Sequence, residues 1–104
     1  MALKTEIFDA ADYLKTPEAQ AEYLSIALED GDLDRIKRAL GTLARAQGMT
    51  EVARAADVGA KSLYKSLGED GNPAFGTVLR VMHALGLALR AAPARAQDHE
   101  AEPA

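Results

Sequence analysis

The fold of this chain is decided by residues 49–67, MTEVARAADVGAKSLYKSL. Thr50 is a suitable N-cap for a first short helix, because its hydroxyl can accept a bond from a free backbone N–H. Asp57 and Gly59 then favour a tight turn, since Asp tolerates turn conformations and Gly takes positive φ without strain. A second helix is expected over residues 60–67. The stretch therefore predicts two short helices joined by a turn.

The second of these helices carries different chemistry on its two faces. At about 100° per residue, Leu63 and Leu67 share the inner face. The outward side chains are basic, hydroxylic or aromatic, and such a short exposed helix is suited to a groove of DNA. Surface lysines that only keep the helix in solution are the alternative interpretation. The candidate DNA-binding residues are Thr50, Ala60, Lys61, Ser62, Tyr64 and Lys65.

Three longer helices are expected around this pair. The first covers residues 16–30, the second residues 32–47 and the third residues 72–85, where Asn72 caps the helix and Pro73 begins it. The inner face of the third helix is apolar: Phe75, Val78, Leu79, Met82 and Leu85. The periodicity thus predicts an all-α domain of five helices.

Two helices and a turn in this order resemble the helix-turn-helix of λ-repressor-like (Xre-type) proteins, and the resemblance rests on the pattern Met-Thr-x-x-Ala-x-x-x-x-Val-x-x-x-x-Leu-Tyr-Lys-x-Leu. A longer run is similar to the probable addiction module antidote family, a HigA-like group of antitoxins. This run is GMTEVARAADVGAKSLYKSLGEDGNPAFGTVLRVMHALGL. An upstream segment resembles the N-terminal half of the same family. Its sequence is FDAADYLKTPEAQAEYLSIALEDGDLDRIKRALGTLAR. The resemblance implies a λ-repressor-like domain that represses its own operon by binding operator DNA. It also implies a basic RelE/HigB-like toxin partner that cleaves mRNA.

The sequence departs from that family at four positions. Many members carry Gln at Glu51, Gly at Asp57, Ser at Gly59 and a polar or basic residue at Ala60. Loss of the Gln and of the basic residue removes expected DNA contacts, and a glutamate repels phosphate. The departures at Glu51 and Ala60 therefore keep open a protein-interaction module that no longer binds DNA. A stand-alone Xre-type repressor without a toxin is a further alternative.

Charge is divided unevenly along the chain, although the net charge is only −4. Residues 1–34 hold two basic residues against nine acids, and residues 35–68 hold seven basic residues against two acids. The basic segment contains the candidate DNA-binding helix, and the acidic segment suits a basic protein partner. The candidate toxin-binding residues are Glu18, Glu22, Glu29 and Asp30.

Arginines also recur on the outer face of the helix at 32–47. They are Arg35, Arg38 and Arg45. A solvated helix surface explains them, and so does contact with phosphate or with a partner protein.

The expected domain covers residues 16–90, with the helix-turn-helix at 49–67. An arm over residues 1–15 precedes it and a disordered tail over residues 91–104 follows it. Residues 87–90, LALR, alternate in polarity. They are either a strand that pairs with its counterpart in a homodimer or a frayed end.

Several kinds of chemistry have no support in the sequence. The chain contains no cysteine, which excludes disulfides and thiolate metal sites and fits a reducing cytoplasm. No apolar run is long enough to span a bilayer, and no signal peptide is recognisable at the N-terminus, so a cytoplasmic protein without a membrane partner is expected. His83 and His99 have no plausible ligand partners nearby, and the common catalytic motifs are missing. We therefore expect no enzyme activity, no cofactor and no metal.

Overall fold

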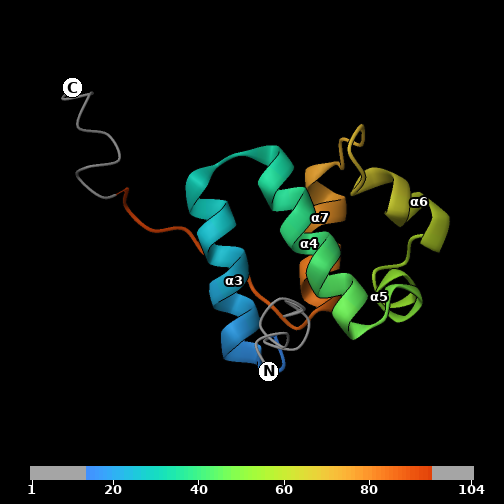
Figure 1. Cartoon of the computed structure of the whole chain (residues 1–104), viewed down its shortest axis with the longest axis horizontal. Helices are drawn as coiled ribbons and strands as arrows, with labels where there is room; N and C mark the ends of the chain where they lie inside the picture. Colours follow the sequence, from blue (N-terminus) through green and yellow to red (C-terminus); the bar gives the residue numbers. More distant parts are fainter. Residues whose placement is uncertain (1–13, 95–104) are drawn as a thin grey trace, which may run out of the picture.

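The computed structural model describes residues 14–94 of the chain. This part is all-helical and contains no strand, which confirms the expected all-α, five-helix fold (Figure 1). None of its helices is long and apolar enough to cross a membrane. The arm expected over residues 1–15 lies outside the described residues up to position 13, as does the expected tail from position 95. The helices are α3 (Pro17–Asp30), α4 (Leu33–Gln47), α5 (Met49–Ala55), α6 (Ala60–Ser66) and α7 (Phe75–Ala84).

The first two helices, α3 and α4, form an antiparallel pair whose ends match the local sequence signals. The Ala19 N–H donates to Thr16 Oγ1 at 3.1 Å, which caps α3. Gly31 ends α3 in the left-handed region, with φ 74°. The Asp34 N–H then donates to Asp32 Oδ1 at 3.0 Å and caps α4. The chain therefore reverses direction within Gly31 and Asp32, so that α3 packs along α4.

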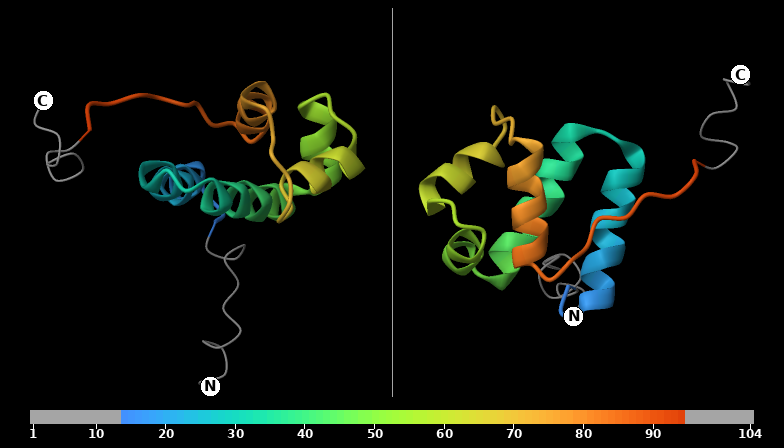
Figure 2. Two further views of the ribbon diagram at one scale, coloured as in Figure 1. Left: turned by 90° about the horizontal axis from the view of Figure 1, so that it is seen from above. Right: turned by 180° about the vertical axis from the view of Figure 1, so that it is seen from behind.

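The core lies where the other three helices meet this pair. Figure 2 shows α7 on one side of the layer formed by α3 and α4, with α5 and α6 beside α4 on the side away from α3. Each helix contributes at least one buried apolar residue to a single cluster. Its largest fully buried side chains are Leu24, Leu40, Val52, Leu63, Val81 and Met82.

The start of α5 differs from the sequence expectation. Thr50 is not the N-cap but the second residue of the helix, and Gly48 caps it without a side-chain bond. Gly48 ends α4 as well, because its N–H donates to the Ala44 carbonyl at 2.8 Å while its own carbonyl accepts from Val52 at 3.0 Å. One glycine with φ 118° thus serves both helices, which leaves no residue between them for a separate cap.

The turn between α5 and α6 also differs in its detail. The residue in the left-handed region is Asp57, with φ 59°, whereas Gly59 is extended with φ −71°. The Val58 N–H donates to the Ala53 carbonyl at 3.0 Å and the Asp57 N–H to the Arg54 carbonyl at 3.1 Å. These two bonds form a Schellman motif, in which the residue after the C-cap must be left-handed. Val58 is partly buried and packs against the core.

The beginning of α7 lies later in the chain than Asn72 and Pro73, where it was expected. Ala74 is the N-cap and Phe75 the first helical residue. The expected inward position of Phe75 is wrong, because its side chain is 66 % exposed. The first turn of α7 extends past the buried cluster, and the contacts of this helix with the core begin at Val78.

The segment after α7 is irregular in the single chain. Leu87 is buried, and its N–H donates to the Met82 carbonyl at 2.9 Å, which closes the end of α7. Residues 87–94 contain no strand. A strand needs a partner to satisfy its backbone groups, so the pairing of residues 87–90 across a homodimer stays a prediction about two chains.

Candidate nucleic-acid interface

The helix α6 exposes the face that the sequence assigned to DNA. Leu63 is fully buried and fixes the inner side of the helix. The side chains of Lys61, Ser62, Tyr64 and Lys65 are all exposed. The four candidates therefore share the exposed side of α6, and this helix lies at the edge of the molecule (Figure 1).

The other two candidates, Thr50 and Ala60, lie in the first turns of α5 and α6. Thr50 is exposed in the first turn of α5. Ala60 begins α6 but is half-buried and packs against the core, so its methyl group has a structural role. Next to Thr50, the Glu51 carboxylate lies 3.9 Å from the Arg54 guanidinium. This pair partly offsets the negative charge that Glu51 brings to the interface.

The loop after α6 is held from below by a residue that the sequence pattern did not identify. Lys37 of α4 is only 4 % exposed. Its Nζ donates to the carbonyls of Gly71 at 2.6 Å and Glu69 at 3.2 Å, and it lies 3.5 Å from Asp34 Oδ1. Lys37 is thus a clamp between α4 and the loop. The available signal was its position, one residue after Ile36 and on the same helical face as Ala44.

Gly71 fits this loop against the end of α6. A Cβ atom at this position would overlap the carbonyl oxygens of Lys65 and Ser66. The backbone of the loop therefore lies directly on the last turn of α6, which any larger residue would push away. Lys37 and Gly71 therefore both hold the loop that follows α6 in place.

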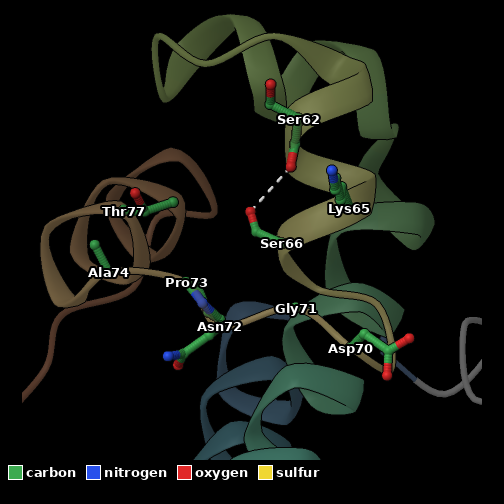
Figure 3. Close-up of a pocket in the computed structure, with 9 residues that line it drawn as sticks. All are labelled: Ser62, Lys65, Ser66, Asp70, Gly71, Asn72, Pro73, Ala74 and Thr77. Carbon is green, nitrogen blue, oxygen red and sulfur yellow. Dashed lines mark hydrogen bonds between the residues drawn. The ribbon is translucent and has the colours of Figure 1, made fainter.

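An open pocket of about 400 Å³ separates α6 from the start of α7. Figure 3 shows Ser62 and Ser66 of α6 on one side and Thr77 of α7 on the other, with the 70–73 loop between them. Lys65 belongs to the same lining. Ser66 Oγ donates to the Ser62 carbonyl at 2.9 Å, so its hydroxyl hydrogen is already used within the helix. The pocket therefore continues the polar face of α6.

A second hollow, of about 190 Å³, lies on the other side of α6. Tyr64 shares its lining with Arg38 and Arg45 of α4. Arg35 is not part of this lining. Its guanidinium instead lies 2.9 Å from the Asp30 carboxylate. The arginines of α4 therefore separate into a pair beside the candidate DNA-binding helix and a third residue in an ion pair with α3.

The acidic candidates lie apart from this interface. Glu18, Glu22, Glu29 and Asp30 are exposed on α3, which packs on α4 away from α6 (Figure 1). The two candidate surfaces thus occupy different sides of the molecule, so both can be accessible at once.

Comparison with known proteins identifies the family. The family model described as "Probable addiction module antidote protein" matches residues 4–93. The chain belongs to this family. An uncharacterised protein of Haemophilus influenzae is 42 % identical over 80 residues, which are 77 % of this chain and 82 % of that relative. No solved structure gives a significant match.

Membership of the antidote family bears on both surfaces. An antidote acts on a toxin, so a toxin partner is implied in general terms. Antidote proteins are typically regulators rather than enzymes. The two exposed surfaces of this antidote, one basic and one acidic, are consistent with two different partners.

Proposed function

We propose that this antidote is a HigA-like antitoxin with an Xre-type helix-turn-helix. It neutralises a basic RelE/HigB-like toxin that cleaves mRNA, and it represses its own operon. The observation that carries the proposal is the exposed face of α6, with Lys61, Ser62, Tyr64 and Lys65 around a buried Leu63, in a chain of the antidote family. The proposed place of action is the cytoplasm, where operator DNA and mRNA are found.

Operator binding would use α6 as the recognition helix. A homodimer would insert two copies of α6 into successive major grooves, about 34–36 Å apart. Lys61 and Lys65 would contact guanine edges or phosphates, and Ser62 and Tyr64 would donate hydrogen bonds or contact a thymine methyl. Thr50 and Ala60, at the starts of their helices, would approach the DNA backbone.

Arg38 and Arg45 would extend this contact on the flank of α6. They line the hollow beside Tyr64, and no ion pair with a carboxylate occupies either of them among the described residues. A DNA strand leaving the groove beside Tyr64 would meet both guanidinium groups. Each phosphate that is neutralised adds about 0.9 to the salt slope of binding.

Toxin binding would use the acidic surface of α3. Residues 1–34 hold nine acids against two basic residues, and the four candidates Glu18, Glu22, Glu29 and Asp30 are exposed there. A basic toxin would be attracted to this surface and repelled by the α6 side. Neutralisation and repression would therefore use different faces of the chain.

A titration of the upstream promoter DNA tests the proposal. It is carried out at two salt concentrations, with and without the product of the adjacent gene. Replacement of both Lys61 and Lys65 by Ala should weaken binding by about 1–3 kcal/mol for each of the two lysines that reads a base. Lys15→Ala is the matched control, because Lys15 is exposed before α3 and away from α6.

The outcomes separate the proposed function from its alternatives. Salt-sensitive binding that changes with the partner supports an autoregulating antitoxin. Binding that ignores the partner supports a stand-alone repressor. No binding in either condition supports an interaction module. The exposed Glu51 beside Thr50 favours that alternative, because its carboxylate would repel phosphate.

A further inference from the structure

The outer face of α3 carries a large apolar side chain among its acids. Ile26 is 60 % exposed, whereas Leu24 of the same helix is buried. Glu22 lies one turn before Ile26 and Asp30 one turn after it, and Glu29 lies at the i+3 position. Residues at these spacings are neighbours on a helix surface. Three of the four residues at these spacings are therefore carboxylates, the fourth being Tyr23, and Glu22, Glu29 and Asp30 are here called the acidic ring of Ile26.

We propose that Ile26 is the apolar anchor of a docking surface for a basic protein. The partner would cover Ile26 with a shallow apolar pocket and place its basic side chains against the surrounding acids. The inference rests on the proposed antitoxin function and names the contact that would hold the toxin. Binding energy at protein interfaces is concentrated in a few anchors whose polar surroundings exclude water. An isoleucine inside a ring of charges has this arrangement.

The charges around Ile26 select the kind of partner. Arg35 already pairs with Asp30 at 2.9 Å, so the negative charge at that end of the ring is partly neutralised. Glu22, and Glu18 one turn earlier, make no ion pair within residues 14–94. The cations of the partner are therefore expected to meet Glu18 and Glu22, while its apolar socket covers Ile26. Nucleic acid would be repelled here, and so would the same acidic face of a second copy.

The position of α3 keeps this surface independent of operator binding. The helix α3 is an outer helix that packs on α4, and α6 lies on the far side of α4 (Figure 1). A partner seated on Ile26 leaves Lys61 and Lys65 uncovered. A change at Ile26 should therefore affect the protein partner and leave DNA affinity unchanged.

The test compares two aspartate substitutions at exposed apolar residues. Binding of the purified product of the adjacent gene is measured by calorimetry for the full-length wild type, Ile26→Asp and Phe75→Asp. Phe75 is the matched control, because it is 66 % exposed but lies on α7, in a surface without this acidic ring. Ile26→Asp should raise the Kd by about tenfold or more, and Phe75→Asp should leave it within about threefold.

Two further variants separate the anchor from its ring. Ile26→Leu keeps the apolar contact and should retain most of the affinity. Glu22→Lys reverses one charge, and its loss of affinity should shrink as salt is added. Thermal unfolding by circular dichroism verifies that each variant is folded. This is expected because the side chains of Glu22, Ile26 and Phe75 are all exposed.

Three results would overturn the inference. If the wild type forms a complex whose Kd is unchanged in Ile26→Asp, the anchor is refuted while the antitoxin function stands. If the wild type forms no complex at all, both the anchor and the toxin partner are refuted. DNA binding is then judged from the promoter titration alone. If Ile26→Asp instead changes the sedimentation coefficient of the protein alone, the surface is covered by a second copy.

Discussion

Lys37 Nζ lies 2.6 Å from the carbonyl oxygen of Gly71, and this bond ties the middle of α4 to the loop that follows α6. The same ammonium group donates to the Glu69 carbonyl at 3.2 Å. Lys37 is therefore a buried cation whose ammonium group is used inside the protein. Its role is to hold the candidate recognition helix rather than to contact a ligand.

Replacement of Lys37 by Met should lower the free energy of unfolding by about 1–3 kcal/mol. The substitution keeps the apolar stem but leaves two loop carbonyls without their donor. Urea denaturation measures the loss. Arg38→Met is the control, because Arg38 is exposed on the next position and a surface change of this kind stays within about 0.5 kcal/mol. Equal stability of the two variants would show that Lys37 is not a clamp.

Gly71→Ala should destabilise the loop and weaken DNA binding together. The added Cβ would overlap the carbonyls of Lys65 and Ser66, so the loop must move away from α6. A cost of about 1–3 kcal/mol is typical of such overpacking. Gly76→Ala is the control with the opposite sign, because its Cβ would meet only the end of Arg80 at 4.0 Å, and Ala is the better helix former. A Gly71→Ala variant as stable as the wild type would contradict the close packing.

The protein should be more stable with Gly at position 57 and less stable with Val there. The φ of Asp57 is 59°, in the left-handed region, where a β-branched side chain is strained. We expect Asp57→Val to cost about 1–2 kcal/mol, which corresponds to several degrees in the Tm of a small domain. Asp57→Gly should raise the Tm slightly, since the relief of strain exceeds the greater flexibility of the unfolded chain. A fall in Tm for the glycine variant would refute this account of the turn.

Arg80→Met should loosen the end of α5. Arg80 Nε donates to the Ala56 carbonyl at 3.0 Å, which joins α7 to the residue that caps α5. Loss of this bond should cost about 0.5–1.5 kcal/mol. Hydrogen exchange should show faster exchange for the amides of Asp57 and Val58 than in the wild type. His83→Ala, at an exposed position of α7, should leave these amides unchanged.

Features that depend on neighbouring residues were determined by the sequence. Thr16 and Asp32 cap their helices through bonds that span two or three residues, so their types alone predict them. The outward face of α6 follows from the helical period, since a buried Leu63 turns Lys61 and Lys65 to solvent. The resemblance to the probable addiction module antidote family was also visible in the sequence, and the family match over residues 4–93 confirms that part of it.

The predicted cap of α5 and the predicted left-handed residue of the turn were wrong, because in each case two residues close in sequence could take the same backbone position. Thr50 is a good N-cap type, but Gly48 already capped both adjoining helices. Gly59 is the usual residue for positive φ, but the bonds of the Schellman motif required it at Asp57. In each case residue preference located the helix boundary to within two residues, and the hydrogen bonds decided which residue took each position.

Only the tertiary structure decided how distant residues share space. Lys37 and Gly71 are 34 positions apart, and no local pattern states that a lysine on α4 will meet a loop carbonyl after α6. The exposure of Ile26 and Phe75 was decided in the same way, because an apolar residue on a helix is buried only if another element covers it. Helical period and caps are local properties of the backbone, whereas burial and charge pairing depend on which helices pack together.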